Sequence, residues 1–374
     1  MKVVHLTSCH PVFDNRVFYK ECRSMAAAGF DVVYVVPHHE DLVVDGVRIH
    51  AIPKPTNRIQ RVFTTILNVY DAAIREDADL YHFHDPELAI VGMLLRARGK
   101  PVIYDIHEDY YTSIKQKTYM NPLLRPVLAR LCAAVEDRLP NFFDIVLAER
   151  YYAKRFPMGH NVLNYPIIDH FQSGPTYDPS SSRRPRLLYT GFIGEDRGVF
   201  HHANIVNLVP DVEVHMIGMC GEAVATKAFE IAGDNGDRLI IEGVGEYVPH
   251  QRILDKYNQG GWLAGLAVFP QTPHYYQKEL TKFYEYMTNG MPTICSDFPV
   301  WKSLVQDNGF GLCVNPSKPD ELASAITRLI DHPDQATAIS DRGRQAVQDE
   351  YNWDTQANAL AALYRRILEG RSRA

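Results

Sequence analysis

Residues 277–297 read QKELTKFYEYMTNGMPTICSD and combine a helical pattern with a short apolar run. The stretch predicts a helix over 279–289, because apolar side chains recur on one face at helical spacing: Phe283, Tyr286 and Met287. A glycine and a proline then end the helix. The apolar run 293–296 that follows predicts a strand buried on both faces. A helix leading directly into such a strand is typical of an α/β protein with a parallel sheet.

The same alternation runs through the rest of the chain. Further strands are expected at 3–6, 31–37, 47–53, 80–84, 101–107, 144–148, 187–190, 212–217, 239–242, 263–269 and 311–314. Helical patterns lie between or after them at 15–28, 58–75, 86–97, 122–138, 198–207, 222–231, 319–330, 337–350 and 355–371. The pattern therefore predicts two doubly wound, Rossmann-like domains.

The domain boundary is expected in residues 173–186, which read SGPTYDPSSSRRPR and have no periodic apolar face. We interpret them as a linker between an N-terminal domain, 1–172, and a C-terminal domain, 187–352. The last segment, 353–374, predicts a helix that packs back on the N-terminal domain. Two such domains are expected to face a cleft that holds the ligands.

Composition excludes several classes of protein. Of the 374 residues, 46% are hydrophobic and 22% are charged, as in globular proteins rather than disordered or fibrous ones. The net charge of −6 argues against nucleic-acid binding through bulk charge. Six cysteines without a CxxC pair favour reduced thiols in the cytoplasm. We also expect no signal peptide and no membrane-spanning run.

Polar side chains follow two strands of the first half. His84 and Asp85 come at the end of one strand, and either face the cleft or serve as a packed histidine and a helix N-cap. His107 and Glu108 end the next strand. We expect His107 to touch substrate, although a structural histidine is the alternative. The spacing around it does not favour a metal site, since no second ligand cluster accompanies it.

The turn after the first strand carries Asp14, Asn15 and Arg16. It occupies the usual place of a phosphate-binding turn but has no glycine, so it is not a dinucleotide fingerprint. Asp14 or Asn15 is expected to cap the next helix. Arg16 either serves an anion or lies on the solvated face.

The second half holds a more suggestive loop, residues 190–198, which includes Gly191, Gly194 and Arg197. Glycines let backbone amides approach a phosphate, and a helix N-terminus adds positive potential. Lys282 lies in the first turn of the helix described above, where a cation is disfavoured by the dipole. An anionic ligand at that place would offset the repulsion, whereas the alternative is a capped helix with solvated charges.

Together these segments resemble the family 4 retaining glycosyltransferases, which have the GT-B fold. The likeness is carried by KFYEYMTNGMPTICSD at 282–297 and GFGLCVNP at 309–316. FDNRVF at 13–18 and HDPEL at 84–88 resemble a bacterial branch that builds lipopolysaccharide, capsule or exopolysaccharide. The resemblance covers nearly the whole chain.

The resemblance implies roles for seven residues. Glu285 matches a glutamate that binds the nucleotide ribose, and Arg197 stands where the family has a lysine for the diphosphate. Lys282 lies in the turn that contacts phosphate and sugar. His107 matches a histidine that faces the transferred sugar, and Asn164 an asparagine near the hinge. The resemblance also places Leu280 and Thr281 in the donor-binding turn.

Three positions depart from the family. Gln277 replaces a second glutamate that normally contacts sugar hydroxyls, so this contact becomes neutral or moves to Glu279. Phe192 occupies the position of a second cation, and the glycine-rich turn after the first strand is absent. These changes affect the identity of the donor more than the fold.

The expected activity is therefore transfer of a hexose-type sugar from a nucleoside diphosphate sugar to a glycan or lipid-linked glycan, with retention. No metal and no other cofactor is expected, and no nucleic-acid partner. Competing readings are a nucleotide-sugar epimerase or phosphorylase on the same fold, or a degenerate, non-catalytic partner subunit. The segment 114–138 mixes basic and apolar residues, so it is either a layer helix or a peripheral contact with the inner face of the cell membrane.

Overall fold

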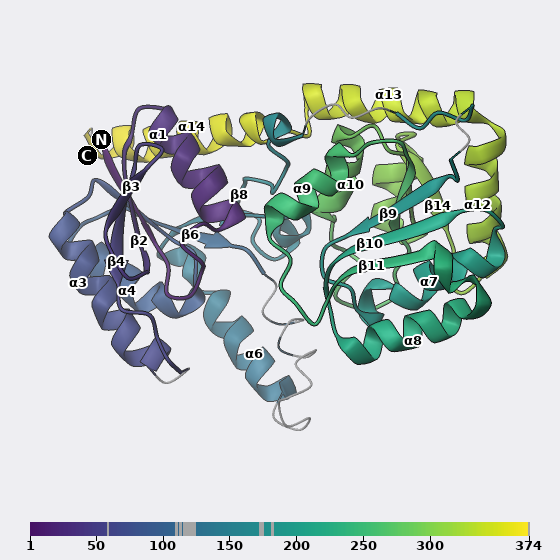
Figure 1. Cartoon of the computed structure of the whole chain (residues 1–374). Coiled ribbons are helices and arrows are strands. Elements are labelled where there is room, and N and C mark those ends of the chain that lie inside the picture. Colours follow the sequence, from purple (N-terminus) through teal and green to yellow (C-terminus); the bar gives the residue numbers. More distant parts are fainter. Residues whose placement is uncertain are drawn as a thin grey trace. The chain divides into compact units, whose positions relative to one another are not determined.

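The computed structural model describes residues 1–57, 60–108, 111, 114, 125–171, 176–180 and 183–372. The chain divides into two compact units. One comprises Met1–Asn164 and Trp353–Ala374, and the other Tyr165–Asn352 (Figure 1). The division falls at Asn164, whereas the sequence pattern placed it between 172 and 187. The predicted linker belongs to the second unit, and its residues 173–175, 181 and 182 lie outside the described residues.

An eight-stranded sheet forms the first unit, in the order β3-β4-β2-β1-β5-β6-β7-β8. All neighbours pair in parallel except β3 and β4. Its strands are β1 Lys2–Leu6, β2 Asp31–Pro37, β3 Leu42–Val44, β4 Val47–Ile52, β5 Leu80–Phe83, β6 Val102–Ile106, β7 Asp144–Leu147 and β8 His160–Asn161. The central strands β1, β5 and β6 are almost wholly buried, which explains their continuous apolar sequence.

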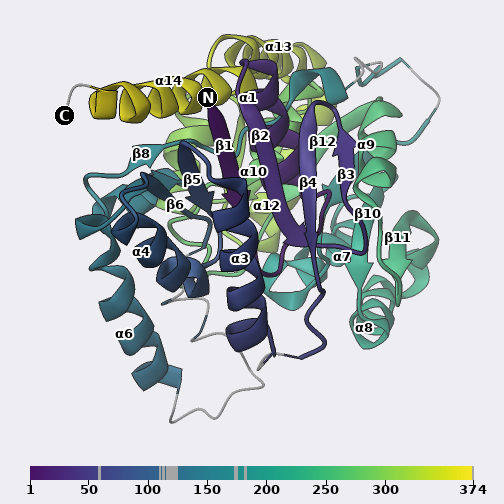
Figure 2. The same ribbon diagram turned by 90° about the vertical axis from the view of Figure 1, so that its left-hand side faces the viewer.

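Helices cover the first sheet. A π-helical segment, Asn15–Cys22, continues as α1, and a second one, Arg61–Thr65, continues as α3. Figure 2 shows α3 and α4 side by side against the strands. The helices are α1 Arg23–Ala27, α3 Ile66–Glu76, α4 Ala89–Ala97, α6 Arg125–Glu136 and α14 Trp353–Ser372.

The C-terminal helix α14 is part of the first unit. The indole of Trp353 donates to the Ser24 hydroxyl (2.7 Å), and the Tyr364 hydroxyl contacts His82 (2.6 Å). The ring of Tyr364 also packs on Phe30. The helix therefore closes over the same side of the sheet as α1.

The second unit is a six-stranded parallel sheet in the order β11-β10-β9-β12-β13-β14. Its strands are β9 Arg186–Thr190, β10 Glu213–Cys220, β11 Leu239–Val244, β12 Trp262–Ala267, β13 Thr293–Ser296 and β14 Gly311–Val314. Its helices are α7 Val199–Leu208, α8 Glu222–Ala232, α9 His250–Asn258, α10 Thr281–Thr288, α11 Pro299–Trp301, α12 Pro319–Asp331 and α13 Pro333–Asp349. Figure 1 shows α7 and α8 on one face of this sheet and α9 and α10 on the other.

Each sheet reverses its strand order once. In the first unit the chain starts at β1 and later returns to its other side with β5. In the second it starts at β9 and returns to its other side with β12. Ligands of doubly wound sheets bind beyond the carboxyl ends of the strands at such a reversal. Ligand binding is therefore expected beyond the carboxyl ends of β1 and β5 in the first unit, and of β9 and β12 in the second. Among the helices that the structure describes, none is long and apolar enough to cross a bilayer.

Candidate functional site

A glycine turn stands at the reversal point of the second unit. β9 ends at Thr190, and Gly191 follows with a φ of +96°, a left-handed conformation that favours glycine. The turn ends at Gly198, where α7 begins. A Cβ atom at Gly198 would lie only 1.8 Å from the Val268 carbonyl oxygen, so no other residue fits there. The predicted loop at 190–198 thus has the tight backbone that its glycines indicated.

Lys282 points into this turn from the start of α10. The helix begins at Thr281, and Leu280 precedes it without a side-chain cap. The Lys282 ammonium donates to the Thr190 carbonyl oxygen (2.9 Å) and lies 3.9 Å from the centre of the Tyr189 ring. Burial, and secondly the charge of Arg197, hold the pKa of Lys282 well below its usual value. A buried ammonium at a positive helix end is an electrostatically costly arrangement.

Arg197 reaches the same place from the other side of the turn. Its Nε donates to the Tyr275 hydroxyl (2.9 Å), and its guanidinium lies against the rings of Phe192 and Tyr275. A Cβ atom at Gly191 would lie 3.9 Å from the Lys282 Nζ and 4.0 Å from an Arg197 Nη. Within the described part of the chain, neither cation forms an ion pair with a carboxylate. Two converging cations without a counter-ion form an anion site.

Glu285 lies one turn further along α10 and is half-buried. Its Oε2 accepts a hydrogen bond from the Tyr257 hydroxyl (2.8 Å), which also contacts the Thr190 hydroxyl (2.6 Å). The carboxylate is therefore held in place beside the glycine turn. It can accept hydrogen bonds from hydroxyl groups of a ligand whose phosphates lie on Lys282 and Arg197.

The structure places the remaining donor-side candidates around the start of α10. Glu279 accepts a hydrogen bond from the Tyr284 hydroxyl, and Gln277 is exposed. Leu280 and Thr281 form the N-cap and the first helical residue. Gly194 opens the short 3-10 turn Glu195–Arg197 that carries Arg197. The helix begins two residues later than the predicted start at 279.

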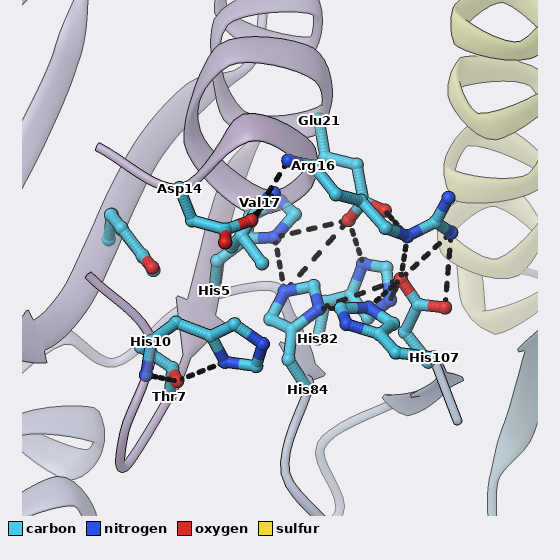
Figure 3. A network of polar contacts seen from close by, with 12 residues as sticks. His5, Thr7, His10, Asp14, Arg16, Val17, Glu21, His82, His84 and His107 are labelled. Carbon is cyan, nitrogen blue, oxygen red and sulfur yellow. Dashed lines mark hydrogen bonds and ion pairs between the residues drawn. The ribbon is translucent and has the colours of Figure 1, made fainter. Parts of the chain in front are cut away.

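The first unit brings together a second set of polar residues, at the ends of β1, β5 and β6 (Figure 3). His107 follows β6, and its side chain is only 13% exposed. Its Nε2 lies 2.7 Å from Oδ2 of Asp105, and its carbonyl oxygen accepts a hydrogen bond from Tyr152. His84, at the end of β5, contacts the same ring nitrogen through its Nδ1 (3.2 Å). The carboxylate of Asp105 and the imidazole of His84 thus fix the orientation of the His107 ring.

The environment of Arg16 matches neither of the expectations from the sequence, which were a site for an anionic ligand and a solvated helix face. Its guanidinium is buried and makes three hydrogen bonds of 3.1–3.2 Å with the two carboxylate oxygens of Asp105. It also lies 3.0 Å from Oε1 of Glu21. The reason is a partner 89 residues away in the sequence, which local spacing does not reveal.

Asp85 occupies the N-cap position of the 3-10 turn Pro86–Leu88, but its side chain does not cap it. Instead, its carboxylate accepts hydrogen bonds from the Thr7 hydroxyl (2.6 Å), the Ser8 amide (2.7 Å) and the Cys9 thiol (2.9 Å). Burial opposes its ionisation, yet these contacts and His10 hold the pKa of Asp85 well below its usual value. Asp85 therefore fixes the turn after β1.

The other candidates of the first unit lie nearby. Asp14 caps the π-helical segment by accepting from the amides of Arg16 and Val17, as expected. Asn15 begins that segment, and Glu108 is exposed. Asn164 accepts a hydrogen bond from Lys20 (2.6 Å).

Sequence reasoning missed four buried residues behind His84: His5, Glu21, His82 and Tyr364. Burial is the main cause that lowers the pKa of His5 and of His82 and raises that of Glu21. Burial also lowers the pKa of His84, to about 4. One signal was available, since His82 and His84 are two residues apart in a strand and share one face.

Two family models match the chain. "Glycosyltransferase Family 4" covers residues 15–156, and "Glycosyl transferases group 1" covers residues 278–346. The second match includes Lys282 and Glu285, and the first includes Arg16, His84 and His107. Both functional regions therefore lie within the matched segments, apart from the glycine turn.

Individual proteins agree with these matches. The α-D-kanosaminyltransferase of Streptomyces kanamyceticus is 26% identical over 300 residues, which are 74% of this chain and 73% of that one. The structure resembles a sucrose-phosphate synthase from Thermosynechococcus elongatus, with a TM-score of 0.75, 18% identity and 99% of both chains covered. It also resembles WaaG, a glycosyltransferase involved in lipopolysaccharide biosynthesis, with a TM-score of 0.67, 13% identity, and 97% of this chain and 99% of WaaG covered.

The two parallel-sheet units, the two family matches and the structural neighbours agree with one another and with the motifs at 282–297 and 309–316. The chain belongs to the family 4 glycosyltransferases and has the GT-B fold.

Proposed function

We propose that this glycosyltransferase moves a hexose-type sugar from a nucleoside diphosphate sugar to a glycan or lipid-linked glycan of a bacterial surface polysaccharide, with retention of anomeric configuration. The observation that carries the donor assignment is the pair Lys282 and Arg197, two cations that converge on Gly191 without a carboxylate partner among the described residues. A diphosphate supplies the missing negative charge.

The chemistry of the reaction explains why such a site matters. Breaking the bond between the anomeric carbon and the phosphate oxygen leaves negative charge on the diphosphate. Lys282, Arg197 and the N-terminal amides of α10 stabilise that charge as it develops. In this proposal no metal ion is needed at the diphosphate, because the two cations and the helix take its place.

The other residues have supporting roles in the proposal. Glu285, held by Tyr257, accepts hydrogen bonds from the ribose hydroxyls of the donor. The first unit binds the acceptor, and His107 contacts the transferred sugar. The new bond forms on the face that the diphosphate leaves, and the leaving phosphate takes the proton of the acceptor hydroxyl. The family assignment supports retention, and the likeness to WaaG and the motifs at 13–18 and 84–88 support the polysaccharide role.

The first prediction concerns the donor. In a thermal-shift screen of nucleoside diphosphates and their sugars, one base should raise the unfolding midpoint, since a ligand of the native state stabilises it according to its concentration and affinity. That donor should turn over with a glycan acceptor in the presence of EDTA, and NMR of the product should show a retained anomer. Turnover without an acceptor, or only with phosphate, would instead identify an epimerase or a phosphorylase. Binding without any turnover would identify a partner subunit.

The second prediction concerns membranes. Helix α6 exposes four apolar side chains to between 39% and 62%: Val127, Leu128, Leu131 and Val135. Residues 115–124, also part of the segment 114–138, lie outside the described residues. We propose that α6 lies on anionic lipid beside a lipid-linked acceptor. The chain should co-sediment with phosphatidylglycerol vesicles, and the Leu131→Gln/Val135→Gln variant should lose most of that binding. Equal binding of the variant, or equal binding to neutral vesicles, would contradict this contact.

A further inference from the structure

A cluster of ligand-type side chains lies inside the first unit, whereas the anion site belongs to the second unit (Figure 3). His5 and His82 are register partners on β1 and β5, and His84 is two residues further along β5. Glu21 comes from the π-helical segment packed above them. All four residues are at most 1% exposed.

The side chains point at one centre. Oε2 of Glu21 lies 3.9 Å from Nδ1 of His5, 3.9 Å from Nδ1 of His82 and 3.9 Å from Nε2 of His84. The nitrogens of His5 and His84 are 3.0 Å apart. Ligand atoms around a tetrahedral zinc ion are about 3.4 Å apart. Polar atoms arranged in the same way around a water molecule are about 4.5 Å apart, because hydrogen bonds are longer. The three distances to Oε2 lie between these two spacings, and the 3.0 Å hydrogen bond of His5 with His84 is shorter than both, so a metal ion would draw Oε2 toward the imidazoles and part those two rings slightly.

Glu21 gives an independent indication of a missing ligand. Neither of its carboxylate oxygens accepts a hydrogen bond in the structure, although both are buried. Arg16 Nε lies 3.0 Å from Oε1 without hydrogen-bond geometry and offsets the charge of Glu21 there, whereas the distances to the histidines are those of Oε2. Oε2 is buried without a hydrogen-bond donor among the described residues, which is costly, and a divalent ion among the imidazoles would supply its partner.

Two of the three histidines are held as metal ligands are, whereas the second ring nitrogen of His82, Nε2, has no hydrogen-bond partner in the described part of the chain and lies 3.9 Å from Asp105. Histidines that bind a metal usually hold their second ring nitrogen against a polar group, and ligating carboxylates are held in turn. The second nitrogen of His5 lies 3.2 Å from the Tyr364 hydroxyl. That of His84 lies 3.2 Å from His107 and 3.5 Å from Asp105. Arg16 occupies the corresponding place beside Glu21.

We propose that His5, Glu21, His82 and His84 bind one divalent transition-metal ion of the zinc class. Three imidazoles and a single carboxylate suit such an ion and not magnesium or calcium, which prefer oxygen ligands. Four protein ligands in a closed interior make the ion structural rather than catalytic. His82 gives up its contact with Tyr364 on binding, and the hydroxyl remains with His5. The ion ties β1 and β5 to the π-helical segment and fixes the imidazole that lies behind His107.

The test is the metal content of the tag-free chain expressed in medium supplemented with cobalt, a spectroscopic substitute for zinc. We expect one Co²⁺ per chain and the visible absorption of a tetrahedral Co²⁺ site. The intense near-ultraviolet band of a thiolate ligand should be absent, which distinguishes this cluster from Cys9, His10 and Asp85, another group of ligand-type side chains. Wild-type protein without cobalt or zinc, or with a thiolate band, overturns the proposal.

Variants assign the ligands. Glu21→Gln keeps the shape of the side chain and removes its charge, and His82→Gln removes one imidazole. Each should retain less than a tenth of the wild-type metal after dialysis against a chelator. The control is His38→Gln, which alters a histidine pair at the end of β2 in the same unit and should keep its full metal content. If Glu21→Gln fails to fold, His82→Gln still decides the outcome, because full retention of metal in that variant would assign the ion to Glu21, His84, Asp105 and His107 instead and overturn the proposal. Loss of metal from the His38 variant alone would contradict the assignment.

Discussion

Replacing Lys282 with methionine is expected to weaken the binding of the nucleoside diphosphate by roughly tenfold to a hundredfold, while making the empty protein more stable. A charge-assisted hydrogen bond is worth about 1.5–3 kcal/mol, which corresponds to that range of affinity. Methionine is similar in length and uncharged, and it removes a buried ammonium that lies over the rings of Tyr189 and Phe269 and has no carboxylate partner among the described residues. The two effects should therefore have opposite signs, as expected of a residue that serves a ligand at the expense of stability.

The measurements are calorimetric titration of the nucleoside diphosphate and denaturant unfolding of the empty protein. Arg197→Ala should weaken binding by at least about tenfold for the same reason. Lys227→Met is the matched control, since this lysine also lies over an aromatic ring, that of Phe200, but on the exposed helix α8. Its affinity for the nucleotide should equal that of the wild type. An unchanged affinity in both the Lys282 and Arg197 variants would contradict the donor site.

The lowered pKa of Lys282 predicts how the affinity for the nucleoside diphosphate depends on pH. Burial, followed by Arg197, lowers the pKa of Lys282 in the empty protein, and a bound diphosphate raises it again. Between these two pKa values the complex holds one proton more than the free protein, so the affinity falls as the pH rises through that window. Titrations in buffers of different ionisation enthalpy should show this proton uptake, and Lys282→Met should abolish it.

Most of the fold and of the candidate site of the second unit could be predicted from the sequence, because the patterns that indicate them lie within short segments. The glycines at 191 and 198 indicated the turn, and the lysine at a helix start indicated an anion; the structure brings both together. Helix α9 was missed, since HQRILDKYN offers only three apolar positions in nine residues. Strand β3, three residues long, carries equally little pattern.

The polar contacts of the first unit were harder to predict, because the residues that form them are far apart in the sequence. Arg16 forms hydrogen bonds with Asp105, so its interpretation as an anion site or a surface residue was wrong. The carboxylate of Asp85 binds the turn after β1, so its interpretation as a helix cap was also wrong. His5 sits among apolar neighbours and Glu21 between Lys20 and Cys22, so they look like ordinary members of a strand and a helix. What they do depends on the strand order β1-β5-β6, which no single segment specifies.

The buried ion pair between Arg16 and Asp105 gives the largest expected change in stability. Arg16→Met is expected to reduce the free energy of unfolding of the first unit by about 3–5 kcal/mol, the usual cost of removing one partner from a buried pair. The methionine leaves the carboxylate of Asp105 fully buried beside that of Glu21, without the guanidinium that lies against both. Arg23→Met is the control, because its pair with Asp45 is exposed to solvent and should contribute at most about 1 kcal/mol.

Hydrogen exchange in increasing denaturant measures this loss where it occurs, since a chain of two units need not unfold in a single step. Amides of β1 and β6 should lose protection in the Arg16 variant, whereas those of β9, in the other unit, serve as the internal reference. The double variant Arg16→Met/Asp105→Leu also removes the unpaired carboxylate of Asp105 and should recover part of the loss; the part that remains includes the lost contact of Arg16 with Glu21. If the single variant kept its protection in β1 and β6, or if the double variant were less stable than the single one by the full cost of a second lost partner, the pair would not act as a buried electrostatic unit.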